Sequence, residues 1–235
     1  MDIAANLETV RQRIAAACAR SGRDPSVVTL VTVTKGQPAD IVCSAAQLGL
    51  SLFGENRVQE AKAKIGLCPA RLQWHLIGHL QSNKCRDAVH FFSMIQSLDS
   101  LPLAREIQKW ADQSAKTMPV LIEVNVAGES SKFGYSPEKV LADLMEINGL
   151  PRIEIQGLMT VAPYSRQPET VRPVFRRLRE LKKQCEDLLG APLLHLSMGM
   201  SGDFEVAVEE GATMIRLGSA VLGTRAPAGP AAAAP

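Results

Sequence analysis

Residues Val27 to Pro38 read VVTLVTVTKGQP. Valines and a leucine alternate with threonines as far as Thr34, a composition typical of a strand buried in a parallel sheet. Lys35 ends this run, so the stretch predicts a charged amine at the carboxyl end of a buried strand. Such a lysine either emerges into solvent in the following loop, which the strand alone favours, or acts as a nucleophile toward a carbonyl.

The composition narrows the class of protein. The chain has 235 residues, enough for one large α/β domain or two small ones, and is 46% hydrophobic. A net charge of +2 and 4% aromatic residues give no reason to expect nucleic-acid or membrane-surface binding. The five cysteines form no CxxC pair, which argues against disulfides and a zinc site and for a reducing compartment. The N-terminus has no signal pattern and no apolar run approaches the length of a membrane span, so we expect a soluble, cytoplasmic protein without a bound metal.

Strand-like and helix-like segments alternate along the chain. An amphipathic helix over residues 2–21 comes first, capped by Asp2. Predicted strands lie near residues 30, 52, 75, 93, 122, 155, 195 and 215, the fourth over Phe91–Ile95, and each is followed by a helix or helical turn. The longest predicted helix runs from about Glu169 to Leu189, with an apolar stripe on Val174, Leu178, Leu181, Cys185 and Leu188.

This alternation decides the fold class. It indicates a parallel sheet, and eight units in a chain of this length predict a single (β/α)₈ barrel of the TIM type with an extra N-terminal helix. No Gly-x-Gly-x-x-Gly follows a strand, so a Rossmann fingerprint is absent. We expect one barrel domain over residues 1–225 and a disordered, low-complexity tail over residues 226–235, APAGPAAAAP.

The predicted strand ends gather the polar residues. Active sites of such barrels lie at the carboxyl ends of the strands, and phosphate groups are frequently bound by the loops after strands seven and eight. These two loops read SMGMSGDF and RLGSAVLG, and both combine glycine with serine. The glycines could simply make tight turns, or they could let the backbone approach a phosphate. A phosphate site facing a strand-end lysine indicates a phosphorylated carbonyl compound, of which pyridoxal 5'-phosphate (PLP) is the commonest cofactor. Other polar or special residues at the predicted strand ends are Glu55, Asn56, His75, Glu123, Asn125, Met159, Thr160, His195, Ser197 and Arg216.

Five blocks of sequence resemble a known family. They are VTVTKGQP, FGENRVQEAKAK, WHLIGHLQSNK, GLMTVAP and LSMGMSGDFEVAVEEGATMIRLGSAVLGTR, and in order and spacing they resemble the pyridoxal phosphate homeostasis proteins. The resemblance runs from the first helix to Arg225 and implies a barrel like the N-terminal domain of alanine racemase. It also implies a PLP site: an internal aldimine on Lys35, phosphate held by Ser201, Gly218 and Ser219 with Ser197 nearby, Arg216 facing the pyridine nitrogen, and Asn56, His75 and Met159 lining the ring pocket.

Three residues depart from the sequence that is usual in the family. Gly36-Gln37 and Arg57 stand where other residues are common in the family, and neither change touches the groups expected to anchor the cofactor. Arg57 would alter the rim of the pocket.

The implied function is binding rather than catalysis. A guanidinium facing the ring nitrogen is a permanent donor, so that nitrogen would stay unprotonated and the ring would be a poorer electron sink. Alanine racemase-like enzymes take a second base from an added β domain, which we do not expect here. We therefore expect a protein that buffers PLP or delivers it to apo PLP-dependent enzymes. The sequence leaves the oligomeric state open, and a monomer fits a barrel without an obvious exposed apolar helix. Two alternatives remain: a weakly active PLP-dependent amino-acid enzyme of the racemase type, and a barrel aldolase that uses Lys35 on a sugar phosphate.

Overall fold

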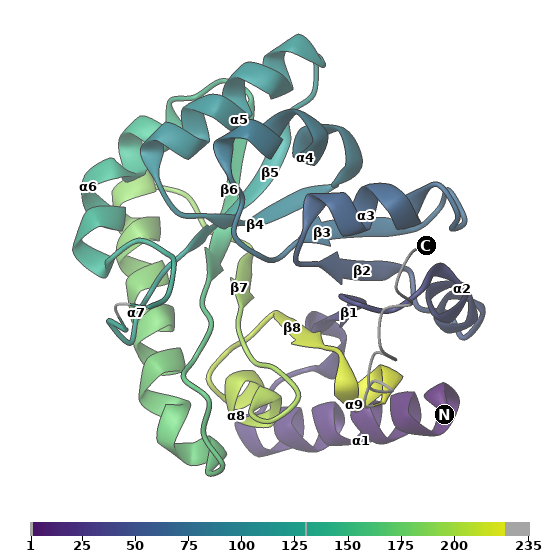
Figure 1. Cartoon of the computed structure of the whole chain (residues 1–235). Helices are drawn as coiled ribbons and strands as arrows, with labels where there is room; N and C mark the ends of the chain where they lie inside the picture. Colours follow the sequence, from purple (N-terminus) through teal and green to yellow (C-terminus); the bar gives the residue numbers. More distant parts are fainter. Residues whose placement is uncertain (1, 130, 224–235) are drawn as a thin grey trace.

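The eight strands pair in chain order, and β8 closes on β1 (Figure 1). Each pairing is parallel. The predicted (β/α)₈ barrel is therefore confirmed. The computed structural model describes residues 2–129 and 131–223, so the predicted tail over residues 226–235 lies outside the described residues. The strands are β1 (Thr29–Val33), β2 (Leu52–Glu55), β3 (Gln73–Leu76), β4 (Met94–Leu98), β5 (Met118–Glu123), β6 (Ile153–Met159), β7 (His195–Ser197) and β8 (Met214–Leu217).

Helices surround the barrel on its outer side (Figure 1). Ser100 caps α5 and Ser136 caps α6, each with a proline in the first turn, as expected of helix starts. The helices are α1 (Ile3–Ser21), α2 (Ala39–Gln47), α3 (Val58–Ile65), α4 (Cys85–Phe91), α5 (Leu101–Gln113), α6 (Pro137–Asn148), α7 (Arg172–Leu189), α8 (Phe204–Glu209) and α9 (Ser219–Leu222), with short 3-10 turns at Pro25–Val27, Ser82–Lys84 and Pro168–Val171.

The predicted N-terminal helix covers the region where the barrel closes. Asp2 accepts a hydrogen bond from the Ala5 N–H at 2.9 Å, which caps α1 as predicted. In Figure 1, α1 runs beside α8 and α9. Arg13 pairs with Glu205 of α8 at 2.9 Å, and the Asn6 amide donates to the Val221 carbonyl of α9 at 3.1 Å. These contacts tie the start of the chain to the last two helices.

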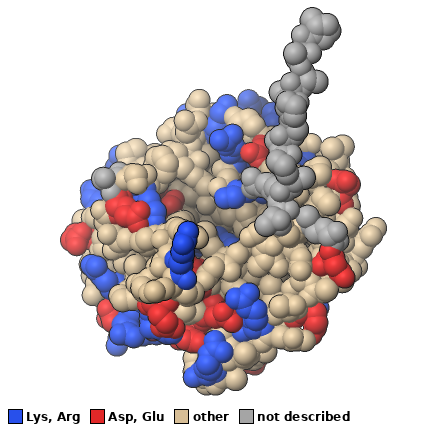
Figure 2. Space-filling model, turned by 60° about the horizontal axis from the view of Figure 1, so that its bottom comes forward, with Lys and Arg blue, Asp and Glu red and all other residues tan. Residues whose placement is uncertain are grey.

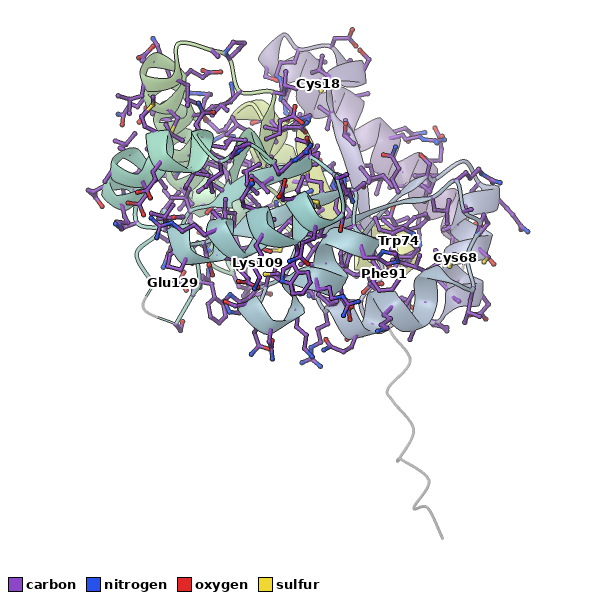
Figure 3. The ribbon with its side chains drawn as sticks, turned by 90° about the horizontal axis from the view of Figure 1, so that it is seen from above. Cys18, Cys68, Trp74, Phe91, Lys109 and Glu129 are labelled. Carbon is purple, nitrogen blue, oxygen red and sulfur yellow. The ribbon has the colours of Figure 1, made fainter. Side chains whose placement is uncertain are left out.

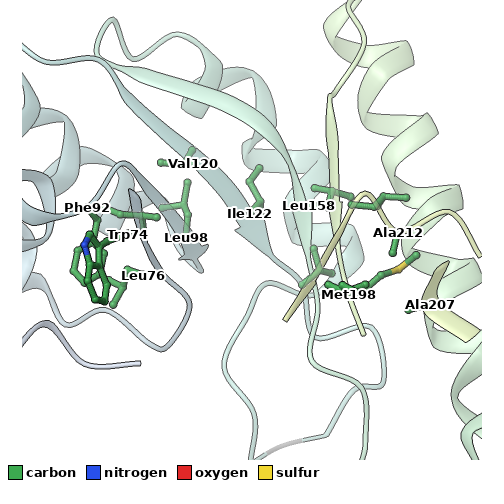
Figure 4. Packing of buried hydrophobic residues seen from close by; sticks show 14 of the residues in the cluster. Trp74, Leu76, Phe92, Leu98, Val120, Ile122, Leu158, Met198, Ala207 and Ala212 are labelled. Atoms are coloured by element: carbon green, nitrogen blue, oxygen red, sulfur yellow. The ribbon is translucent and has the colours of Figure 1, made fainter. Parts of the chain in front are cut away.

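Apolar side chains pack in two separate layers. The larger layer lies between the strands and the surrounding helices, and Figure 4 shows Trp74, Leu76 and Phe92 of this layer packed together. A second, smaller cluster comes from the alternate positions of the strands, which face the interior of the barrel. Its members are Val31, Met94, Leu121, Met159 and Met214. The floor of any site at the carboxyl ends of the strands therefore rests on this inner cluster.

The prediction for the fourth strand was wrong in its bounds. Phe91 ends α4 and Phe92 packs in the outer layer, while the strand begins at Met94 and continues through Gln96 to Leu98. Gln96 and Ser97 are fully buried. Polar residues inside a strand were not expected from an apolar pattern, but the interior of this barrel holds hydrogen-bond partners for Gln96.

Two smaller expectations also need correction. On α7, Phe175 takes a buried position, whereas Leu188 is 50% exposed and lies off the predicted stripe. His195 begins β7 rather than ending it, so its side chain lies at the opposite end of the strand from the predicted site. Its ring approaches the Thr213 hydroxyl at 3.4 Å.

The structure gives the state of the five cysteines. All five are free thiols, and Figure 3 shows Cys18 and Cys68 on well-separated parts of the molecule. Within residues 2–129 and 131–223, no helix is both long and apolar enough to span a membrane.

Candidate functional site

A cavity of about 360 Å³ lies among the carboxyl ends of β1 and β8 and the loops after β2, β6 and β7. This volume is typical of small-molecule sites. It brings together six residues predicted for the site, and its other lining residues include Val33, Ile77, Val161, Tyr164, Ser165, Met200, Gly202 and Asp203. The six predicted residues are Lys35, Asn56, Ser201, Arg216, Gly218 and Ser219. The face shown in Figure 2 is hollowed near its middle, with Lys and Arg atoms beside the hollow.

Lys35 occupies a turn immediately after β1. Its side chain is exposed and lines the cavity, so it follows the strand as the sequence predicts and emerges at the mouth of the barrel. The turn closes with a hydrogen bond of 2.9 Å from the Gln37 N–H to the Thr34 carbonyl. Gly36 adopts a left-handed conformation, with φ of 66°, which residues with a side chain rarely adopt. The local sequence thus places an amine at the edge of the cavity.

The loops after β7 and β8 meet at another wall of this cavity. The Ser201 hydroxyl accepts a hydrogen bond from the Ala220 N–H at 3.3 Å, which joins the two loops. Ser219 begins α9, and Gly218 precedes it. A Cβ at Gly218 would lie 3.2 Å from the Val33 carbonyl oxygen, so the backbone here approaches β1 closely. Two hydroxyls and the backbone N–H groups at the start of α9 are suitable donors for an anion.

Arg216 lies on the floor of the cavity with its guanidinium fixed from below. Its Nη1 donates to the Ser197 hydroxyl at 2.6 Å, and its Nη2 donates to the Thr160 carbonyl at 2.7 Å. Burial lowers the pKa of Arg216 to about 10, while Glu123 and Asp203 favour its charged form, so the group carries its charge at neutral pH. The cavity floor is therefore cationic and rigidly oriented.

Three of the predicted site residues do not line the cavity. His75, Met159 and Ser197 are all buried in the barrel interior. Met159 belongs to the inner apolar cluster. The Ser197 hydroxyl donates to Gln96 Oε1 at 2.6 Å, and Gln96 Nε2 lies 2.8 Å from His75 Nδ1. His75 and Ser197 thus join a chain of hydrogen bonds that supports Arg216.

The direction of this chain defines the state of His75. Since the Gln96 amide nitrogen is a donor, His75 Nδ1 accepts and the proton of the neutral ring resides on Nε2. Burial lowers the pKa of His75 to about 4, and the nearby His195 lowers it further in the same direction. A neutral imidazole at physiological pH follows.

Two acidic residues, Glu123 and Asp203, lie near Arg216. Neither of them was assigned a role from the sequence. Burial raises the pKa of Glu123 to about 7, and repulsion from Asp99 adds to this effect while Arg216 opposes it. Asp203 lines the cavity and accepts a hydrogen bond from the Met200 N–H at 2.6 Å. The described residues contain no group of three or more His, Cys, Asp or Glu side chains that could hold a metal ion.

Comparisons with known proteins place this geometry in a family. The family described as "Alanine racemase, N-terminal domain" matches residues 3–226. A pyridoxal phosphate homeostasis protein of Aquifex aeolicus is 44% identical over 227 residues, which cover 96% of this chain and 99% of the relative. The chain belongs to the pyridoxal phosphate homeostasis protein family. PipY of Synechococcus elongatus, solved with PLP bound, is 34% identical with a TM-score of 0.83, covering 94% of this chain and 100% of PipY.

The fold of this barrel is also similar to that of a domain found in enzymes. An alanine racemase of Clostridium difficile matches with a TM-score of 0.70 at 16% identity, over 94% of this chain and 57% of the enzyme. At that identity the likeness concerns the fold. It confirms the predicted similarity to the N-terminal domain of alanine racemase.

The residues of this member of the homeostasis family fit an aldehyde that carries a phosphate. Among the described residues, the lining of the cavity offers one primary amine, Lys35, in the turn after β1. It offers the hydroxyl groups of Ser201 and Ser219, beside Gly218, whose missing side chain lets the backbone lie close to Val33. Arg216 also lines the cavity, and its guanidinium is held in place by Ser197 and Thr160. PLP carries an aldehyde, a phosphate and a ring nitrogen, and when bound it supplies a reactive carbonyl that forms a reversible bond to an amine.

Proposed function

We propose that this chain binds PLP reversibly at Lys35 and serves PLP homeostasis, by buffering or delivering the cofactor, rather than catalysis. In this proposal Lys35 holds the aldehyde, and Ser201, Gly218 and Ser219 hold the phosphate. Arg216 faces the pyridine nitrogen, and Asn56 borders the ring. His75, Ser197 and Met159 support the pocket from below, through Arg216 or through packing, instead of touching the cofactor.

The observation that carries the proposal is the single cavity that joins Lys35 to the paired loops after β7 and β8. An amine alone would fit many carbonyl compounds, and a phosphate-binding corner alone would fit many anions. Their combination selects a phosphorylated aldehyde. The PLP-bound structure of PipY, which is 34% identical to this chain, supports PLP as that aldehyde.

The environment of Arg216 favours a role in binding PLP over a role in catalysis. Strong stabilisation of a carbanion by PLP needs a protonated ring nitrogen, which a carboxylate partner usually maintains. Arg216 is a donor that keeps its proton at neutral pH, so a ring nitrogen facing it would remain an acceptor. The names of the curated relatives point the same way, because they describe homeostasis. Five free thiols are in keeping with the reducing cytoplasm, where apo-enzymes that accept PLP would be found.

Two assays on the PLP-loaded protein test this function. In the first, the loaded chain is mixed with an apo PLP-dependent enzyme, and recovery of that enzyme's activity is followed against an equal amount of free PLP. In the second, exchange of the Cα proton of amino acids is measured by NMR in deuterated water. The proposal predicts transfer to the apo-enzyme and no exchange above that of free PLP. Exchange that disappears in Lys35→Ala would instead support an enzyme of the racemase type.

A further inference from the structure

A buried ion pair lies directly behind the turn that carries Lys35. Glu55, at the end of β2, and Lys64, on α3, approach to 2.5 Å between Glu55 Oε1 and Lys64 Nζ. Their side chains are 0% and 8% exposed. Neither residue lines the cavity described above.

The position of Lys64 departs from the pattern of its helix. The buried face of α3 consists of Val58, Ala61 and Lys64, so a lysine occupies a position that packing alone would give to an apolar residue. Burying a charge pair costs desolvation energy, and well-packed apolar residues often serve stability as well or better. The burial of this pair is therefore weak evidence that it stabilises the fold. The residues that the pair contacts are a better guide to its role.

The pair holds Thr34, the residue before Lys35. The Thr34 hydroxyl donates to Glu55 Oε1 at 2.6 Å, and Lys64 Nζ donates to the Thr34 carbonyl at 2.8 Å. The Thr34 N–H donates to the Gly54 carbonyl at 3.0 Å, which continues the β1–β2 pairing by one residue. Both the side chain and the backbone of Thr34 are thus fixed by hydrogen bonds.

The other side of Lys35 is held by the same helix. The Gly36 N–H donates to Glu60 Oε2 at 3.0 Å, and Glu60 lies on α3 one turn before Lys64. Lys35 is therefore flanked by two residues that are bound to β2 and α3. These contacts restrain the backbone on both sides of the lysine.

We propose that the Glu55–Lys64 pair, acting through Thr34, positions Lys35 for covalent capture of an aldehyde in the cavity. Glu55 and Lys64 are positioning residues in this scheme, since they contact the turn and not the ligand. The inference rests on the proposed binding of PLP at Lys35. It adds that covalent capture and non-covalent binding depend on separate parts of the chain: the pair serves the amine, and the loops after β7 and β8 serve the phosphate.

The decisive variant removes both charges together. Glu55→Gln combined with Lys64→Met keeps the approximate side-chain volumes and leaves no unpaired charge, so the barrel is expected to fold. A matched control removes an exposed pair between the same helix and α4, Lys62→Met combined with Asp87→Asn, whose charged atoms are 3.3 Å apart. A second comparison is Thr34→Val, which loses the hydroxyl, against Thr34→Ser, which keeps it.

Two ligands separate the two kinds of binding. PLP reports covalent capture through its visible absorbance and through borohydride trapping at Lys35. The analogue 4'-deoxypyridoxine 5'-phosphate has the ring and phosphate but no aldehyde, and reports non-covalent binding by calorimetry. A displacement of a reacting group by about 1 Å can slow a reaction about a hundredfold, so we expect the double variant and Thr34→Val to slow capture about tenfold or more. Analogue affinity should stay within about twofold of wild type, and the control and Thr34→Ser should match wild type in both measurements.

Other results would overturn the inference. Equal losses in PLP capture and analogue affinity would show that the pair supports the whole site, and unchanged capture in the double variant would show that it does not position Lys35. Failure of the wild type to take up PLP would instead refute the proposed function. In that case amide hydrogen exchange of residues 33–37 in the unloaded protein still tests the pair. Faster exchange in the double variant than in the control supports restraint of the turn, and equal exchange contradicts it.

Discussion

Arg216 donates a hydrogen bond of 2.6 Å to the hydroxyl of Ser197, which in turn donates to Gln96 Oε1 at the same distance. A serine hydroxyl has one proton to donate, so Ser197 has none left for a phosphate. Ser197 was predicted to lie near the phosphate. Its hydrogen bonds instead indicate that it supports Arg216 from below. Rigid support of a charged side chain allows it to meet a ligand without reorganisation.

Replacement of Ser197 by alanine should destabilise the barrel. Ser197→Ala leaves both Gln96 Oε1 and one N–H of Arg216 without their partner in a buried site, which costs about 1–3 kcal/mol. Urea unfolding measures this loss directly. Ser44→Ala, at an exposed position on α2, serves as the control and should change stability by less than about 0.5 kcal/mol. Equal stability of the two variants would mean that the hydrogen bonds of Ser197 beneath Arg216 do not contribute to the free energy of unfolding.

Glu123 should make the protein less stable as the pH rises. Its pKa in the folded state is about 7, above the ordinary value of 4.5, so the folded protein holds this proton more tightly than the unfolded chain. Stability is therefore lost between about pH 4.5 and pH 7. Glu123→Gln should raise the free energy of unfolding by about 1–3 kcal/mol at pH 8 and change it little at pH 4.5.

The exposed Glu154 of β6 provides the control for this measurement. Glu154→Gln should leave the slope of stability against pH unchanged. A Glu123→Gln variant that parallels wild type at every pH would show that the carboxyl is not perturbed in the folded state.

His75 should make the protein less stable as the pH falls, the opposite of the effect of Glu123. Its pKa of about 4 lies below the ordinary value of 6.5, so the unfolded chain binds the proton more readily than the folded protein. The stability of the neutral state is present above about pH 6.5 and is lost as the pH falls toward 4, by about 3 kcal/mol. His75→Gln, which cannot take up a proton, should flatten this part of the pH profile. The exposed His90 of α4 offers the comparison, and His90→Gln should keep the wild-type slope.

The sequence was sufficient for the fold because its strand-like runs and helix caps are local signals. The alternation around Val31, the cap at Asp2 and the eight repeated units are all present in the structure. The fourth strand was misplaced because Phe91 and Phe92 look like strand residues but pack outside the barrel, whereas the true strand contains Gln96. A polar residue becomes acceptable in a buried strand only when other strands supply partners, here His75 and Ser197.

The site was partly predictable for a similar reason. Lys35, Asn56, Ser201, Gly218 and Ser219 come soon after strands, and Arg216 lies near the end of β8. Parallel strands bring such residues to one end of the barrel. The register of each strand decides whether a side chain points up into the cavity or down into the interior of the barrel. This register placed His75, Met159 and Ser197 below the cavity. The pairing of Lys64 with Glu55 could not be read from the sequence, since Lys64 resembles any surface lysine of a helix.

The most direct test of the proposed function is chemical mapping of the amine that captures PLP. The purified protein is incubated with PLP, its visible spectrum is recorded, and the complex is reduced with borohydride, digested and analysed by mass spectrometry. We predict a yellow protein with a single phosphopyridoxyl group on the peptide that contains Lys35, and no such group in Lys35→Ala. A protein that stays colourless with excess PLP, or one labelled mainly at another lysine, would contradict the assignment of Lys35.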